Sequence, residues 1–175
     1  MYYGTSKRSD MAILRKQSNR SGRMFWGCFS FYGKGACVTC PETIKKEQYK
    51  ELIDTYLLDD ILLLRETCDP YLLQDNARAH DNKFVYNYFL DNDIKWLNWP
   101  PCSPDLNPIE DVWAIIKART NKKGIPANLA EIEDIFLQEW EKFSESTLKS
   151  LAMSFEGRLR RVVELDGELI NKFYL

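Results

Sequence analysis

The 175-residue sequence lacks long hydrophobic runs, an excess of either charge, and more than a single histidine. Its apolar stretches stay far below the ~20 residues that span a bilayer, and no signal-peptide-like segment opens the chain, so we expect neither a membrane protein nor a secreted one. A net charge of −2 is unlike that of proteins that coat nucleic acid, which are strongly basic. These absences favour a folded protein inside the cell.

Cysteine is sparse, and its spacing offers little chemistry. Five cysteines are an odd number, and without a signal peptide they indicate a reducing compartment. Cys37 and Cys40 have the spacing of a metal or redox pair, but no second pair follows and one histidine does not complete a zinc site. The two also lie in a strand-like stretch, where residues three apart face opposite sides. Zinc and redox chemistry are therefore disfavoured.

The chain does contain enough apolar residues for a core. Hydrophobic residues make up 45% and aromatic residues 13% of the sequence, which predicts one folded domain without disulfides. Basic side chains gather at the start, because residues 1–24 hold six of them against the single acid Asp10. We interpret residues 1–22 as a basic arm and residues 23–175 as the domain. The arm is either an electrostatic handle for a polyanion or a solvated terminus.

The hydrophobic pattern predicts a layered α/β domain. Two β-rich stretches, residues 23–30 and 36–40, flank a glycine turn and indicate a hairpin. Apolar residues at helical spacing predict one helix from about residue 43 to Leu57. The other expected elements are strands at 71–75 and 94–99 and helices that begin near residues 81, 107, 128 and 146.

Two carboxylates fall at the ends of expected elements. Asp75 closes a short apolar strand, where α/β sheets collect catalytic groups, although an aspartate there is more often a turn or cap residue. Glu110 follows Asn107 and Pro108, which suit the N-cap and the first helical position, so Glu110 fits a capping box. Taken alone, Glu110 is structural, and the neighbouring Asp111 is a solvated acid of the first helical turn.

The residues around both acids form motifs. The first motif is residues 74–80 (Gln-Asp-Asn-Ala-Arg-Ala-His), and the second is residues 99–113 (Trp-Pro-Pro-Cys-Ser-Pro-Asp-Leu-Asn-Pro-Ile-Glu-Asp-Val-Trp). Together they resemble the cut-and-paste DNA transposases of the Tc/mariner superfamily. The 34 residues between Asp75 and Glu110 match the spacing of the second and third acids in the glutamate-ending branch of that family's DDE triad. Residues 26–30 resemble the strand upstream of the second acid, and residues 150–159 resemble the closing helix.

The resemblance implies an α/β fold of the ribonuclease-H-like type and a DNA transposase that cuts transposon ends and joins them to target DNA. In this chemistry, acidic side chains hold two divalent ions roughly 3.5–4 Å apart, which activate the attacking oxygen and stabilise the leaving oxygen. It assigns Asp75 and Glu110 as catalytic residues and as ligands of Mg²⁺ or Mn²⁺. Asn76 and His80 also match the motif, and they either contact DNA, orient Asp75 or simply build the loop.

The same resemblance implies partners and a compartment. Transposon ends and target DNA are the implied partners, together with a second copy of the chain or a partner transposase, and no membrane is involved. A eukaryotic protein of this kind acts in the nucleus, and any other acts inside the cell.

The sequence departs from the family pattern at its start. The family's first catalytic aspartate lies on the opening strand, well upstream of Trp26, whereas Asp10 lies too close to Trp26 and in a polar context. The family's helix-turn-helix region is absent as well. We therefore expect an N-terminally truncated domain without its first strand and first acid, with impaired phosphoryl transfer. The alternatives are a catalytically inactive, transposase-derived protein that binds DNA or a partner, and an unrelated nuclease of the ribonuclease-H-like group.

Overall fold

The computed structural model describes residues 2–4, 23–124, 126–168 and 170. Most of the basic arm, Asp10 included, lies outside the described residues. The described chain forms a five-stranded sheet in the order β3-β2-β1-β4-β5, in which β1 to β3 run antiparallel and β1, β4 and β5 run parallel. The strands are β1 (Tyr2–Gly4), β2 (Met24–Ser30), β3 (Gly33–Cys40), β4 (Tyr71–Leu73) and β5 (Lys95–Trp96).

A short strand occupies the centre of this sheet and corrects one expectation. Tyr2 of β1 pairs with Ser30 of β2 on one side and with Leu72 of β4 on the other. The strand position that we expected to be missing is therefore filled, and no sheet edge is exposed between β2 and β4. The three residues of β1 are Tyr2, Tyr3 and Gly4, none of which is acidic, and the absence of the first acid stays a prediction.

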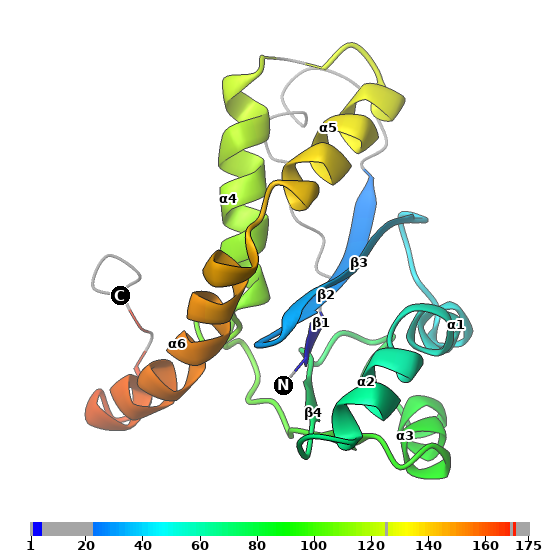
Figure 1. Cartoon of the computed structure of the whole chain (residues 1–175), viewed down its shortest axis with the longest axis vertical. Coiled ribbons are helices and arrows are strands. Elements are labelled where there is room, and N and C mark those ends of the chain that lie inside the picture. The colour runs from blue at the N-terminus through cyan, green and yellow to red at the C-terminus, as the bar shows by residue number, and fades with distance from the viewer. Residues whose placement is uncertain (1, 5–22, 125, 169, 171–175) are drawn as a thin grey trace.

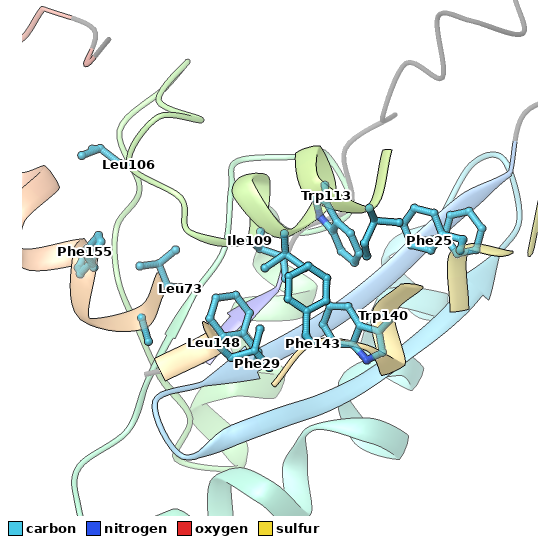
Figure 2. Close-up of a cluster of buried hydrophobic side chains, with 14 of the residues drawn as sticks. Phe25, Phe29, Leu73, Leu106, Ile109, Trp113, Trp140, Phe143, Leu148 and Phe155 are labelled. Atoms are coloured by element: carbon cyan, nitrogen blue, oxygen red, sulfur yellow. The ribbon is translucent and has the colours of Figure 1, made fainter. Parts of the chain in front are cut away.

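Helices cover both faces of the sheet (Figure 1). They are α1 (Lys46–Tyr56), α2 (Leu58–Arg65), α3 (Lys83–Asp91), α4 (Ile109–Lys122), α5 (Leu129–Glu141) and α6 (Glu145–Glu164). Alternating side chains of β2 divide between two cores, because Phe25 and Phe29 pack with α4 to α6 whereas Trp26 and Cys28 pack with α1 to α3. Figure 2 shows the first of these cores, in which Trp113 of α4 and Trp140 of α5 lie over β2.

The expected elements are present with shifted boundaries. The hairpin forms, and the helix expected from about residue 43 to Leu57 is α1, whereas the second helix α2, which begins directly after Leu57, was not expected. The backbone of Leu57 lies outside the helical region, which separates α1 from α2. The side chains of Leu57 and Ile61 are both buried in the core. The strand expected at 94–99 is reduced to Lys95–Trp96. The helix expected near residue 81 is α3, which Asn82 caps by accepting a hydrogen bond from the Val85 amide at 3.0 Å.

The cysteine pair of β3 lies as its spacing predicted. Cys37 packs against the α4 to α6 core and Cys40 belongs to the opposite core, so the two thiols face opposite sides of the sheet. Burial raises the pKa of the Cys40 thiol to about 11 and raises that of Cys37 further. Both remain protonated near neutral pH, a form in which a thiol is a poor nucleophile and metal ligand.

Within the described ranges, no helix has the length and apolar character needed to cross a membrane.

The motif at residues 26–30 needs a glycine at position 27, because a residue without a side chain lets Trp113 of α4 pack closely on β2. A Cβ added at Gly27 would lie 2.8 Å from Cη2 of Trp113, whose ring is held between Phe136 and Trp140. We expect Gly27→Ala to lower the free energy of unfolding by about 1–3 kcal/mol through overpacking. Urea unfolding measures this effect. The control is Gly157→Ala on the exposed face of α6, where nothing lies within 4 Å of the added Cβ and a gain of about 0.5–1 kcal/mol is expected.

A buried carboxylate joins α4 to α5 and makes stability depend on pH. Glu139 is 3% exposed and lies 2.8 Å from Nζ of Lys123 and 2.6 Å from Nζ of Lys142, with Arg119 at 3.8 Å. The hydrogen bond from Lys123, followed by that from Lys142, lowers the pKa of Glu139 from 4.5 to about 2. The stabilisation is therefore complete above the unfolded-state pKa and declines as the pH falls from 4.5 towards 2.

Glu139→Gln tests this linkage. We expect the variant to be less stable than the wild type near pH 6 and the difference to shrink steadily as the pH falls through the window from 4.5 to 2. Urea unfolding at several pH values measures the difference. A difference that stays constant across this window would show that Glu139 stabilises the fold by packing alone.

Candidate functional site

A hollow of about 350 Å³ lies where the carboxyl end of β4 meets the N-terminus of α4. Asp75 follows β4 by two residues, and Glu110 is the second residue of α4. Both carboxylates line the hollow, as do Asn76 and Asn107. The rest of the wall is mostly the loop of residues 99–104, which contains three prolines. The fold thus brings together two acids that the sequence separates by 34 residues.

Asp75 is held in place by hydrogen bonds to one of its oxygens. Nδ1 of His80 lies 2.9 Å from Oδ1 of Asp75, and the amide of Ala77 donates to the same oxygen at 3.1 Å. The Asp75 side chain is 12% exposed and that of His80 is fully buried. Because the carboxylate and the Asp75 carbonyl, at 3.2 Å, both accept, Nδ1 of His80 must carry the proton. This geometry matches the orienting role suggested for His80, which is not among the residues that line the hollow.

A buried aromatic residue in turn holds His80. The Tyr49 ring packs against the imidazole with centroids 4.1 Å apart, and its hydroxyl donates to the Gln74 side chain. Burial, followed by the charge of Asp75, raises the pKa of Tyr49 well above its usual value of 10, so the hydroxyl stays a neutral donor. Sequence reasoning missed Tyr49, whose only signal was an apolar position in the expected helix.

The arrangement leads to a direct test of His80. His80→Phe keeps a ring against Tyr49 but removes the donor to Asp75, and we expect it to lower Mn²⁺ affinity about 10- to 100-fold, as loss of a hydrogen bond to a metal ligand usually does. His80→Asn, which places an amide donor near the position of Nδ1, should recover part of the affinity. Mn²⁺ titration followed by electron paramagnetic resonance measures both. Equal Mn²⁺ affinity in the wild type and in His80→Phe would show that His80 does not orient Asp75 for metal binding.

Asn76 builds the loop that frames the hollow. Its side-chain amide donates to the carbonyl oxygen of Trp99 at 2.7 Å, which ties the segment after β4 to the segment after β5. Asn76 is itself exposed and lines the hollow, so this bond does not remove it from the surface. The structure therefore supports the loop-building alternative and leaves a DNA contact by Asn76 as a prediction.

Glu110 is presented by a well-capped helix start. Oδ1 of Asn107 accepts from the amide of Ile109 at 3.4 Å, so Asn107 caps α4 as predicted, although the helix is assigned from Ile109. In a capping box, Glu110 would accept from the amide of Asn107, but that amide donates to the carbonyl of Pro104 at 3.3 Å. The structural explanation for Glu110 is thereby weakened, and the positive end of α4 favours its ionised form.

The neighbouring Asp111 is not a solvated acid, and this prediction was wrong. It forms an ion pair with Arg158 of α6, whose side chain is only 3% exposed. Arg158 also donates to the carbonyl of Asp105 at 2.8 Å, and the carboxylate of Asp105 accepts from the amide of Ile170 at 2.8 Å. Arg158 therefore fastens both the loop before α4 and the first turn of α4 to α6. Its signal in the sequence was its place in the motif at residues 150–159.

The donor set of the hollow suits a hard divalent cation but is small. Carboxylate oxygens are the ligands that Mg²⁺ prefers, and Mg²⁺ usually keeps several waters and takes further oxygens from substrate phosphates. Across the part of the chain that the structure describes, no group of three or more His, Cys, Asp or Glu side chains could hold a metal ion. Asp75 and Glu110 thus fit a site that relies on water or phosphate oxygens for its remaining ligands.

The fold and the paired carboxylates define a ribonuclease-H-like domain of the kind found in DNA-cutting enzymes. A family model described as DDE superfamily endonuclease matches residues 3–133, and the chain belongs to this family. The chain is 28% identical over 172 residues to the Tc3 transposase of Caenorhabditis elegans, covering 97% of this chain and 52% of that protein. It is 30% identical over 155 residues to the Tcb1 transposase of Caenorhabditis briggsae, covering 82% and 52%. The Tc/mariner resemblance is confirmed, and the chain spans about half the length of these relatives.

Solved structures agree on the fold. The catalytic domain of Mos1 mariner transposase has a TM-score of 0.78 at 13% identity, over 97% of this chain and 83% of that one. The Mos1 paired end complex with Mg has a TM-score of 0.75 at 16% identity, over 97% and 56%. Other structures of the Mos1 catalytic domain hold Raltegravir with Mg or with Mn, at TM-scores of 0.70 and 0.71. The ribonuclease-H-like fold is thereby confirmed.

Proposed function

We propose that this chain is the catalytic-domain part of a Tc/mariner-type DNA transposase and that Asp75 and Glu110 are two of its metal-binding acids. The observation that carries the proposal is that the two carboxylates, at the family spacing, line one hollow between a strand end and a helix start. Relatives named transposases and the Mos1 structures with Mg or Mn support it. The proposed cofactor is Mg²⁺ or Mn²⁺, and the proposed partner is DNA.

Asp75, Glu110 and the loop of residues 99–104 have different roles in the proposed site. Asp75 offers a carboxylate that His80 and the Ala77 amide hold in one orientation, which keeps a ligand in register. Glu110 offers a second carboxylate from the rigid start of α4. Divalent ions held there would activate the attacking oxygen and stabilise the leaving oxygen of a phosphodiester. The loop of residues 99–104 lines the hollow that a DNA strand would enter.

The central strand limits this activity. The resemblance places the first acid on the opening strand of the domain, and no residue of β1, the first strand described here, is acidic. With two acids in place of three, the chain should bind divalent ions weakly and transfer phosphoryl groups poorly. The same observation favours the second candidate function, a catalytically inactive protein that binds DNA or a partner transposase. In either role, we propose that it acts in the nucleus if the source is eukaryotic and that it pairs with a second transposase chain.

Metal-dependent DNA binding separates the two functions. Fluorescence anisotropy of a labelled DNA duplex, measured in Mg²⁺ and in EDTA, should show tighter binding in Mg²⁺ for the full 175-residue chain. Asp75→Asn should abolish that increment, whereas Glu156→Gln, on the exposed face of α6, should keep it. Binding that is equal in EDTA and in Mg²⁺, and unchanged by Asp75→Asn, would support the inactive DNA-binding protein. No binding of DNA at low salt would contradict both.

A further inference from the structure

Asn107, a residue that lines the hollow, carries a buried donor that no described residue satisfies. The residue is 1% exposed, yet it lines the hollow beside Asp75 and Glu110. Its backbone is fully used, because its amide donates to Pro104 and its carbonyl accepts from the amide of Glu110 at 3.1 Å. Its Oδ1 caps the amide of Ile109. Only Nδ2 has no hydrogen-bond partner within the described residues.

The orientation of this amide is fixed by chemistry. The Ile109 amide is a donor, so the atom that faces it must be the side-chain oxygen of Asn107. Turning the group over would place two donors against each other and leave the helix start without its cap. The NH₂ group therefore points away from α4. Leaving a buried donor without an acceptor lowers stability, so the unpaired Nδ2 beside the two acids calls for an explanation.

The kind of acceptor follows from the neighbouring charges. Beside carboxylates that hold divalent cations, a lysine or arginine donor would pair with Asp75 or Glu110 and compete with the metal. A neutral amide donates a hydrogen bond without that competition. The acceptor most compatible with metal ions and with the positive end of α4 is an oxygen of a phosphodiester.

We propose that Asn107 is a substrate-contacting residue, whose Nδ2 donates a hydrogen bond to a phosphate oxygen of the DNA strand bound in the hollow. This inference rests on the proposed function. Nδ2 is buried in the free chain, so the contact requires that DNA binding uncovers it. Asn107 thereby has two roles. Its Oδ1 accepts the hydrogen bond that caps α4, and its Nδ2 donates to the DNA strand whose phosphate the carboxylates face.

Asn107→Ser separates the two tasks. Serine caps a helix about as well as asparagine, so the free energy of unfolding should change little, while the amide donor is lost. In the anisotropy assay with Mg²⁺, DNA affinity should fall about tenfold, as expected for a hydrogen bond to a charged group. The salt dependence of binding should stay unchanged, because no charge is removed. Asn128→Ser, the same change at the cap of α5, should leave DNA affinity unaltered.

A measurement on the wild type covers the case in which Asn107→Ser does not fold. The ¹⁵N resonance of the Asn107 side-chain amide should shift when the duplex is added in Mg²⁺, and that of Asn128 should not. If wild type binds DNA in a metal-dependent way that Asp75→Asn abolishes, but Asn107→Ser binds within twofold of wild type or the Asn107 amide does not shift, this inference is wrong and the proposed function stands. If wild type shows no metal-dependent binding, both are wrong.

Discussion

Arg158→Met should destabilise the domain by about 3–5 kcal/mol, because it removes one partner of a buried ion pair together with the hydrogen bond to the Asp105 carbonyl. Arg158 is 3% exposed, and its guanidinium joins the Asp111 carboxylate to the Asp105 carbonyl across α4 and α6. Methionine keeps most of the side-chain volume, so the loss reports the polar contacts and not a cavity. Urea unfolding monitored by tryptophan fluorescence measures it.

An exposed pair on the same helix provides the control. Arg160 pairs with Glu156 at 2.6 Å, but both side chains are more than 70% exposed, so Arg160→Met should change stability by less than about 0.5 kcal/mol. A double-mutant cycle with Asp111→Asn should show coupling, with the double variant less destabilised than the sum of the two single variants. If Arg158→Met behaves like Arg160→Met, the clamp between α6 and the loop before α4 does not stabilise the fold.

Asp75→Asn should lower Mn²⁺ affinity by at least about a hundredfold, since loss of a hydrogen bond to a metal ligand alone usually costs 10- to 100-fold. Asparagine keeps the shape of the side chain and an oxygen that can accept from the Ala77 amide, so the fold should survive. Glu110 would then be the only carboxylate left at the site, and one carboxylate supplies too few ligands for a hard cation. Mn²⁺ titration by electron paramagnetic resonance measures the change.

The companion variants localise the effect. Glu110→Gln should lower Mn²⁺ affinity to a similar extent, and the double variant should be little worse than either single variant, because the two carboxylates act as one site. Glu156→Gln, an exposed acid on α6, should bind as wild type does. Equal losses in Glu156→Gln and Asp75→Asn would mean that Mn²⁺ binds diffusely to the acidic surface.

The sequence predicted those parts of the site that depend on local pattern. Asp75 and Glu110 were identified by their motifs and spacing, and both line the hollow. The cap by Asn107 followed from its position before Pro108. The cap depends on residues close together in the chain, where cap chemistry leaves a readable signal. The two acids, by contrast, were singled out by the family resemblance of the motifs around them.

The features that the sequence did not predict depend on distant partners. Asp111 looked solvated because its partner Arg158 lies 47 positions further along the chain. The ring of Tyr49 reaches His80 only after α1 packs under the sheet. The strand β1 has three residues, too short for any alternation, and its place is set by pairing with β2 and β4. Such contacts follow from the assembled fold and leave no local periodicity.

The most direct test of the account is to locate bound Mn²⁺ by anomalous scattering in crystals of the full chain soaked with the metal. The account predicts an anomalous peak in the hollow, within coordination distance of the carboxylates of Asp75 and Glu110, and no such peak in Asp75→Asn. Mn²⁺ bound only at other acidic residues, with the hollow empty at saturating metal, would contradict the assignment of these two residues as a metal site.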